Sequence, residues 1–143
     1  MWPSGLQRFT LTADEFTISS SVDGQTDNGQ FSDLALSIWP ANKGAMSDEI
    51  NISMRLSQPV EAGQIIPQIN LSLNVNFVSS LSVFELKTKH VDINRLLKLT
   101  GQEDRFEQHS FSDVNMELTG TFEGQSLSLL SGDISSAHGS LSF

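Results

Sequence analysis

The chain of 143 residues contains no cysteine, which excludes disulfides, thiolate catalysis and thiolate metal ligands. Long apolar runs are also missing, since no window approaches the roughly 18 consecutive apolar residues of a membrane-spanning helix. The first residues, Met1 to Ser4, have neither the basic nor the apolar region of an export signal. An oxidising compartment is therefore allowed but not required. We expect any signal or anchor to lie outside this sequence.

Basic residues are also few. Eight Lys and Arg face 17 Asp and Glu, so the net charge of −9 argues against non-specific binding of nucleic acid. Charged residues make up only 17% of the chain, and its polar residues are mostly Ser, Asn and Gln. This composition favours a β-rich, exported protein surface over a helical cytosolic enzyme. The length predicts one domain over residues 1–143. Because the sequence stops in mid-alternation at Ser140 to Phe143, we expect a segment of a longer chain.

The clearest pattern in the sequence is an unbroken alternation over residues 68–77. Apolar residues at the odd-numbered positions alternate there with Asn70, Ser72, Asn74 and Asn76. Period two is typical of a strand with one buried face. We predict that this stretch is the central strand of an antiparallel sheet.

The same period predicts strands around it. They cover residues 9–18, 34–38, 50–56, 84–88, 114–122 and 127–129, with one or two more over 134–143. Asp14-Glu15 shifts the phase of the first, which indicates either a β-bulge within one strand or a short turn between two. Turn dipeptides predict a loop over residues 21–30, whereas Pro40 and Pro59 end strands.

One segment has helical spacing. Ile93, Leu96, Leu97 and Thr100 follow a 3.6-residue period, with Asp92 as the expected N-cap. The predicted fold is therefore all-β, with an antiparallel sheet of about seven or eight strands, curled or sandwiched, and one short helix near residues 92–100.

Two groups of residues could bind a metal. His90, Asp92, Glu107 and His109 flank the helix and would suit zinc or iron if they converged. The alternative is that His90 ends a strand, Asp92 caps the helix and the others lie in a polar loop. Nothing in the spacing enforces convergence, so we predict no metal and no cofactor.

Asp23, Gln25 and Asp27 faintly resemble a calcium loop, but the terminal glutamate is missing and an ordinary turn-rich loop is the simpler interpretation. The chain also has no nucleophile elbow, phosphate-binding glycine loop or paired catalytic carboxylates. We therefore expect no catalytic residue and a protein that is not an enzyme.

The basic residues are unevenly distributed. Five of the eight form a candidate basic interaction patch: Lys87, Lys89, Arg95, Lys98 and Arg105. Such a patch could meet an acidic partner or anionic lipid headgroups. The alternative is a solvated strand edge, because Glu103, Asp104 and Glu107 partly cancel the positive field.

Four segments carry a resemblance to a known family. Phe9–Asp14 (FTLTAD), Leu36–Pro40 (LSIWP), Val91–Leu97 (VDINRLL) and Leu118–Phe122 (LTGTF) resemble segments of AsmA-like and related β-rich proteins of the Gram-negative envelope. The resemblance implies a periplasmic or cell-envelope protein, held by a membrane anchor, whose long antiparallel sheet curls into an apolar trough. It also implies a role in lipid transport or envelope assembly, and it supplies no catalytic residue.

Under this interpretation one face of the central strands binds lipid or another apolar ligand, with an envelope protein as a possible partner. The candidate groove residues are Ile69, Leu71, Leu73, Val75, Phe77, Phe84 and Leu86. The alternative is a structural or interaction β-sandwich of an adhesin, pilus, secretion system or virion, without a small-molecule ligand. In that case a second sheet would fill the same face.

Overall fold

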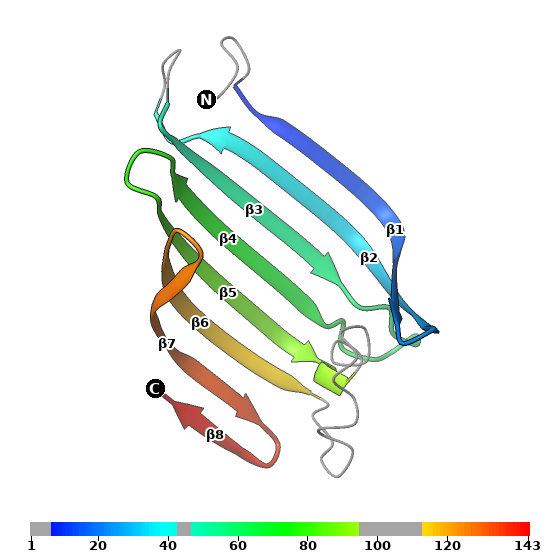
Figure 1. The fold of residues 1–143 in the computed structure, drawn as a ribbon. Coiled ribbons are helices and arrows are strands. Elements are labelled where there is room, and N and C mark those ends of the chain that lie inside the picture. Colours follow the sequence, from blue (N-terminus) through cyan, green and yellow to red (C-terminus); the bar gives the residue numbers. More distant parts are fainter. Residues whose placement is uncertain (1–6, 43–46, 95–112) are drawn as a thin grey trace.

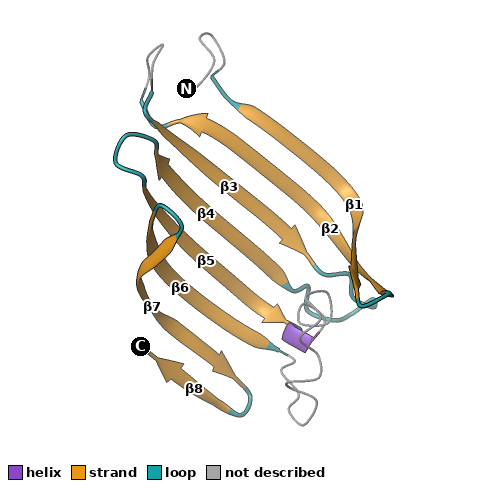
Figure 2. Ribbon diagram, in the orientation of Figure 1, coloured by secondary structure: helices purple, strands orange, loops and turns teal. Residues whose placement is uncertain are grey.

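The computed structural model describes residues 7–42, 47–94 and 113–143, and its strands form one open antiparallel sheet (Figure 1). Strands that follow one another in the chain are neighbours in the sheet, from β1 at one edge to β8 at the other (Figure 2). The strands are β1 (Phe9–Val22), β2 (Gln25–Pro40), β3 (Glu49–Ser57), β4 (Gln68–Asn76), β5 (Leu81–Val91), β6 (Val114–Glu123), β7 (Ser126–Ser136) and β8 (Gly139–Ser142).

The all-β prediction is confirmed. Of the two predicted arrangements, a single curled sheet or a sandwich, the structure has a single open sheet. All eight strands belong to a single sheet, so the described residues build no two-layer sandwich. Of the predicted helix near residues 92–100, only Ile93 and Asn94 are described as helical, and the rest lies outside the described residues. The amide of Asn94 donates to Oδ1 of Asp92 at 3.0 Å, which is the hydrogen bond expected of an N-cap.

The predicted loop over residues 21–30 is wrong. β1 continues to Val22 and β2 begins at Gln25, so that only Asp23 and Gly24 form the turn. Both residues have positive φ, 50° and 79°, as a two-residue hairpin turn that follows the twist of its strands requires. Asn28-Gly29, a turn signal in the sequence, is instead paired within the ladder.

The phase slip at Asp14-Glu15 lies within one continuous strand, so the alternative of a turn between two strands is wrong. The irregularity is most evident in the neighbouring strand. Asp33 has a φ of 53°, and the register between β2 and β3 shifts between Ser32 and Ala35. This left-handed residue changes which face the following side chains take, and Figure 1 shows β1 bending sharply in its second half.

One face of the sheet is apolar across all eight strands. Directly paired residues in an antiparallel ladder point to the same face, so the registers define continuous rows of side chains. We call the surface made by four such rows the apolar face: Leu11–Leu36–Met54–Leu71–Leu86–Leu118–Gly132, Phe9–Ile38–Ile52–Leu73–Phe84–Gly120–Leu130, Leu56–Ile69–Thr88–Met116–Ile134–Leu141 and Pro40–Ile50–Val75–Ser82–Phe122–Leu127.

The opposite surface, the polar face, is built from the intervening rows. These rows hold mostly hydroxyl, amide and charged side chains: Thr10–Ser37–Ser53–Ser72–Glu85–Thr119–Ser131, Thr12–Ala35–Arg55–Asn70–Lys87–Glu117–Asp133–Ser142 and Trp39–Asn51–Asn74–Val83–Thr121–Leu129.

The hydrophobic core covers only one end of the apolar face. Phe31, Leu56, Ile69 and Val91 form the buried cluster, and Phe16 stacks on Phe31 with ring centroids 5.3 Å apart. Val91 has no exposed surface. Two irregularities bring these residues together, because Asp33 and His90 both have positive φ beside a register shift. Elsewhere most residues of the apolar rows are half-buried or exposed.

Candidate functional site

The apolar face contains the predicted groove residues, with one exception. Leu71 pairs with Leu86 and Leu73 with Phe84, while Ile69 and Val75 occupy the flanking rows of β4. Phe77 lies just past the end of β4, where its backbone amide donates to the carbonyl of Asp48 and its side chain is 51% exposed. The structure therefore places Ile69, Leu71, Leu73, Val75, Phe84 and Leu86 on one face, with Phe77 one residue beyond the end of β4.

The face extends well beyond the two strands that the sequence singled out. Phe84 continues the row to Gly120 of β6, and its ring lies 5.4 Å from that of Phe122. A Cβ on Gly120 would collide with the Phe84 ring, so the glycine leaves room for the aromatic side chain. The alternation in β1, β2, β3 and β6 was visible in the sequence, but the cross-strand register that joins these strands into rows was not.

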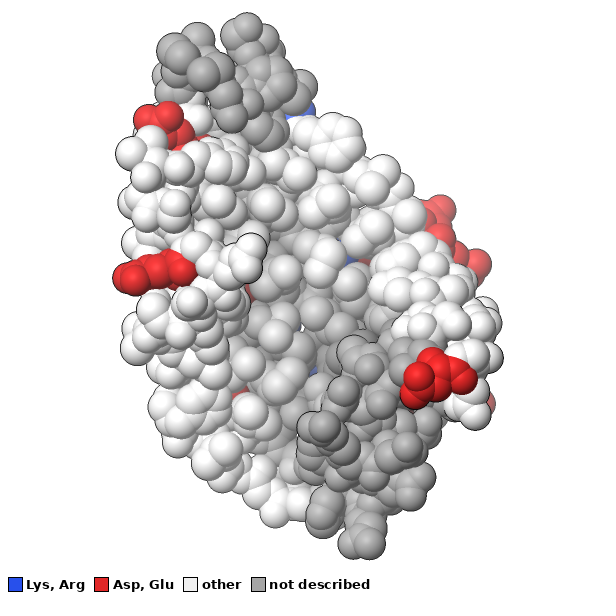
Figure 3. Space-filling model, in the orientation of Figure 1, with Lys and Arg blue, Asp and Glu red and all other residues white. Residues whose placement is uncertain are grey.

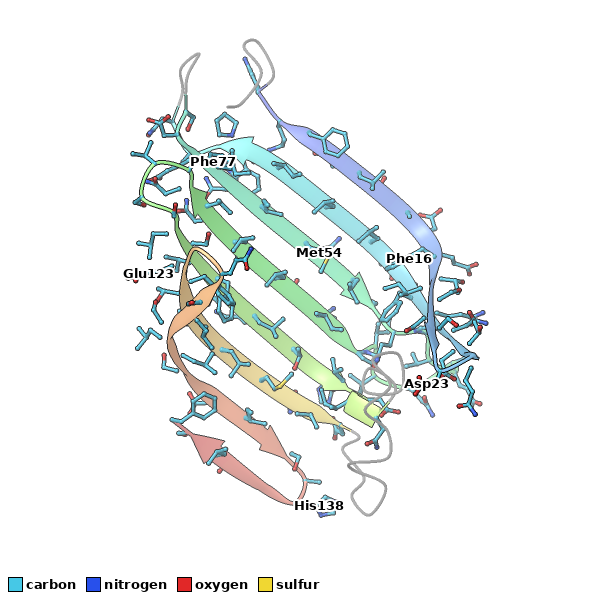
Figure 4. The ribbon with its side chains drawn as sticks, in the orientation of Figure 1. Phe16, Asp23, Met54, Phe77, Glu123 and His138 are labelled. Carbon is cyan, nitrogen blue, oxygen red and sulfur yellow. The ribbon has the colours of Figure 1, made fainter. Side chains whose placement is uncertain are left out.

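No described layer covers the middle and far rows of the apolar face. Leu11 at one edge is 47% exposed, and Leu141 at the other is 60% exposed. Figure 4 places Met54 and Phe16 on this face. In the same orientation Figure 3 shows a hollowed surface with Asp and Glu at its margins and almost no charge in its middle. An exposed apolar surface of this extent marks a binding site more often than a free surface.

The polar face, in contrast, satisfies its own side chains. The Nδ2 of Asn74 donates to Oδ1 of Asn51 at 3.0 Å, and the Nδ2 of Asn76 donates to Oε1 of Glu49 at 2.7 Å. No buried side-chain nitrogen or oxygen in the described residues lacks a hydrogen-bond partner. These hydrogen bonds join neighbouring strands across the polar face.

Of the candidate basic interaction patch, only Lys87 and Lys89 are described, and both lie on the polar side of β5. The Nζ of Lys87 lies 2.6 Å from Glu85 and 2.9 Å from Glu117. Hydrogen bonds to Glu85 and Glu117 raise the pKa of Lys87 above its usual range. Its charge is therefore balanced locally. Arg95, Lys98 and Arg105 lie outside the described residues.

The predicted metal ligands are only partly described. His90 and Asp92 both line a hollow of about 1240 Å³ at the core end of the sheet. His90 contacts Asp113, with 2.6 Å between Nδ1 and Oδ1, and Glu107 and His109 lie outside the described residues. Over the described ranges no three His, Asp or Glu side chains gather as a metal site would require. Asp23, Gln25 and Asp27 belong to the β1–β2 hairpin rather than to a ligand-binding loop.

Comparison with known proteins adds no relative. No protein-family model matches the chain, and no curated protein or solved structure is significantly similar to it. Among the described residues no helix is long and apolar enough to span a membrane.

Proposed function

We propose that this chain is a non-enzymatic β-sheet module that binds lipid acyl chains, or a ligand of similar apolar character, along its apolar face. The observation that supports the proposal is the continuity of that face. Four uncharged rows, each crossing six or seven strands, together cover the sheet from β1 to β8, and most of their side chains remain partly exposed. A chain that needed these residues only for its own folding would cover them.

The dimensions of the face suit an extended hydrocarbon. Seven inter-strand spacings of about 4.8 Å give a width of about 34 Å between β1 and β8. Burial contributes about 0.8 kcal/mol of binding free energy for each fully covered CH₂ group. A long acyl chain therefore binds favourably even when the face covers it only partly. Such a ligand would require no hydrogen-bond partner from the middle of the sheet.

The location that we propose is the periplasm or cell envelope of a Gram-negative bacterium, with a role in lipid transport or envelope assembly. This part of the proposal rests on the resemblance of four segments to AsmA-like proteins. An envelope protein that docks on the same face is the alternative occupant.

Co-purified lipid tests the proposal. The chain is purified without detergent, then analysed by native mass spectrometry and by thin-layer chromatography of an organic extract. We expect adducts of lipid mass that disappear after extraction. A chain without bound lipid by both methods argues against the lipid-binding proposal, and a protein partner in the native spectrum supports the alternative occupant.

A further inference from the structure

The Lys and Arg side chains that the structure describes lie on one side of the sheet. The described residues contain four Lys and Arg side chains, and the other four of the chain lie outside them. Arg55 and Lys87 stand in one row of the polar face, and Lys89, paired with Gln68, shares their side of the sheet. Arg8 stacks on Trp39, also of the polar face, with its guanidinium carbon 4.6 Å from the ring centroid. No described cation therefore lies on the apolar face.

Most of the charges that Figure 3 shows at the left and right margins of the apolar face are negative. Figure 3 shows Asp and Glu around its border, and Figure 4 places Glu123 and Asp23 at the tips of two hairpins there. Glu123 ends β6, and Asp23 occupies the β1–β2 turn. A ligand on the apolar face thus meets uncharged rows beneath it and carboxylates at its border.

We infer that the apolar face discriminates ligands by charge, binding neutral or cationic acyl ligands in preference to anionic ones with the same hydrocarbon chain. The inference rests on the proposed function. An anionic headgroup on this face meets none of the four described cations and is repelled by the border, whereas an ester or alcohol headgroup has no charge to compensate. Because the repulsion acts between solvated charges, salt weakens it.

Three probes with twelve-carbon chains test the inference: dodecanoate, monolauroylglycerol and dodecyltrimethylammonium. Each competes at pH 7.5 and below its micellar concentration against a neutral apolar dye, N-phenyl-1-naphthylamine, bound to the native chain. We expect dodecanoate to bind about fivefold more weakly than monolauroylglycerol. Dodecyltrimethylammonium should bind at least as tightly as monolauroylglycerol. The difference between dodecanoate and monolauroylglycerol should shrink in 0.5 M NaCl.

Two leucines of β7 provide matched variants that separate the charge of the face from the net charge of the chain. Leu127 pairs with Phe122 on the apolar face, whereas Leu129 pairs with Thr121 on the polar face, because the register shifts between them. Their exposed fractions are similar, 49% and 59%, so a lysine is tolerated at either position. Leu127→Lys and Leu129→Lys therefore add the same charge to opposite faces.

We expect Leu127→Lys to tighten dodecanoate binding until it equals or exceeds that of monolauroylglycerol, and Leu129→Lys to leave the preference as in the wild type. Dodecanoate binding to the wild type as tightly as monolauroylglycerol overturns the inference while the proposed function stands. An equal effect of the two lysines also overturns it, since net charge would then be the cause. If no probe displaces the dye, or if the dye does not bind, the proposed function itself fails.

Discussion

The two faces of this sheet come from the same strands, yet they differ in what their side chains achieve. On the polar face, amide, hydroxyl and charged groups bond to one another across the strands, as Asn51 does with Asn74. On the apolar face, the buried cluster of large side chains lies at the end where Phe31 and Val91 pack, among the residues that the structure describes. Side chains of the polar face thus bond to one another across the strands, whereas most of the apolar face stays partly exposed.

This difference separates the residues that hold the fold together from those available for binding. The buried cluster lies where β1 and β2 bend, at the irregularity around Asp33. Leu11 and Leu141, at opposite edges of the sheet, contribute little buried area. A substitution should therefore cost most where the apolar face is closely packed and least where it is open.

The largest effect is expected where the backbone itself leaves no room on the apolar face. A Cβ at Gly132 would collide with the carbonyl oxygen of Glu117 and with the side chain of Leu118. We expect Gly132→Val to lower the free energy of unfolding by about 3 kcal/mol, measured by urea denaturation. Ser131→Val introduces the same side chain at the adjacent residue, which lies on the exposed polar face. It should change the free energy of unfolding by less than about 0.5 kcal/mol. Equal losses would contradict the assignment of the two faces.

A smaller effect distinguishes the two ends of the apolar face. Leu56→Ala, in the buried cluster, should cost about 2–3 kcal/mol of unfolding free energy, near the low end for a buried leucine because the cluster is small. Leu11→Ala, at a 47% exposed position of the same face, should cost less than about 1 kcal/mol. Urea midpoints measured in parallel provide the comparison. A large loss at Leu11 would mean that another layer covers the open rows.

The sequence predicted much of this fold because alternation is a local signal. The period-two patterns of β3, β4 and β6 were clear, and so was the strand end at Pro40. It failed at the β1–β2 hairpin, where Asn28-Gly29 gave a turn signal that pairing with Ile18 and Ser19 overrides. Composition does not reveal positive φ at Asp33 or His90, so the bends that create the core could not be located.

The candidate site was predicted in part for a similar reason. Leu71, Leu73, Phe84 and Leu86 were recognised as one surface because β4 and β5 form a hairpin, whose register follows from sequence proximity. The complete rows from Leu11 to Gly132 and from Phe9 to Leu130 depend on five further registers between neighbouring strands. A bulge at Thr121 and Phe122 moves Leu129 to the polar face, which alternation alone could not predict.

Titration with N-phenyl-1-naphthylamine tests most directly whether the apolar face is an open binding surface. The account predicts a saturable rise in fluorescence for the wild type and for Ser72→Asp, and binding about tenfold weaker or more for Leu71→Asp, because that charge stands within the apolar rows. Far-UV circular dichroism checks that both variants fold. A second pair of single variants repeats the comparison at exposed positions of β1, with Leu11→Asp on the apolar face and Thr12→Asp on the polar face. Absence of dye binding to the folded wild type, or equal binding by the paired variants, would contradict the account.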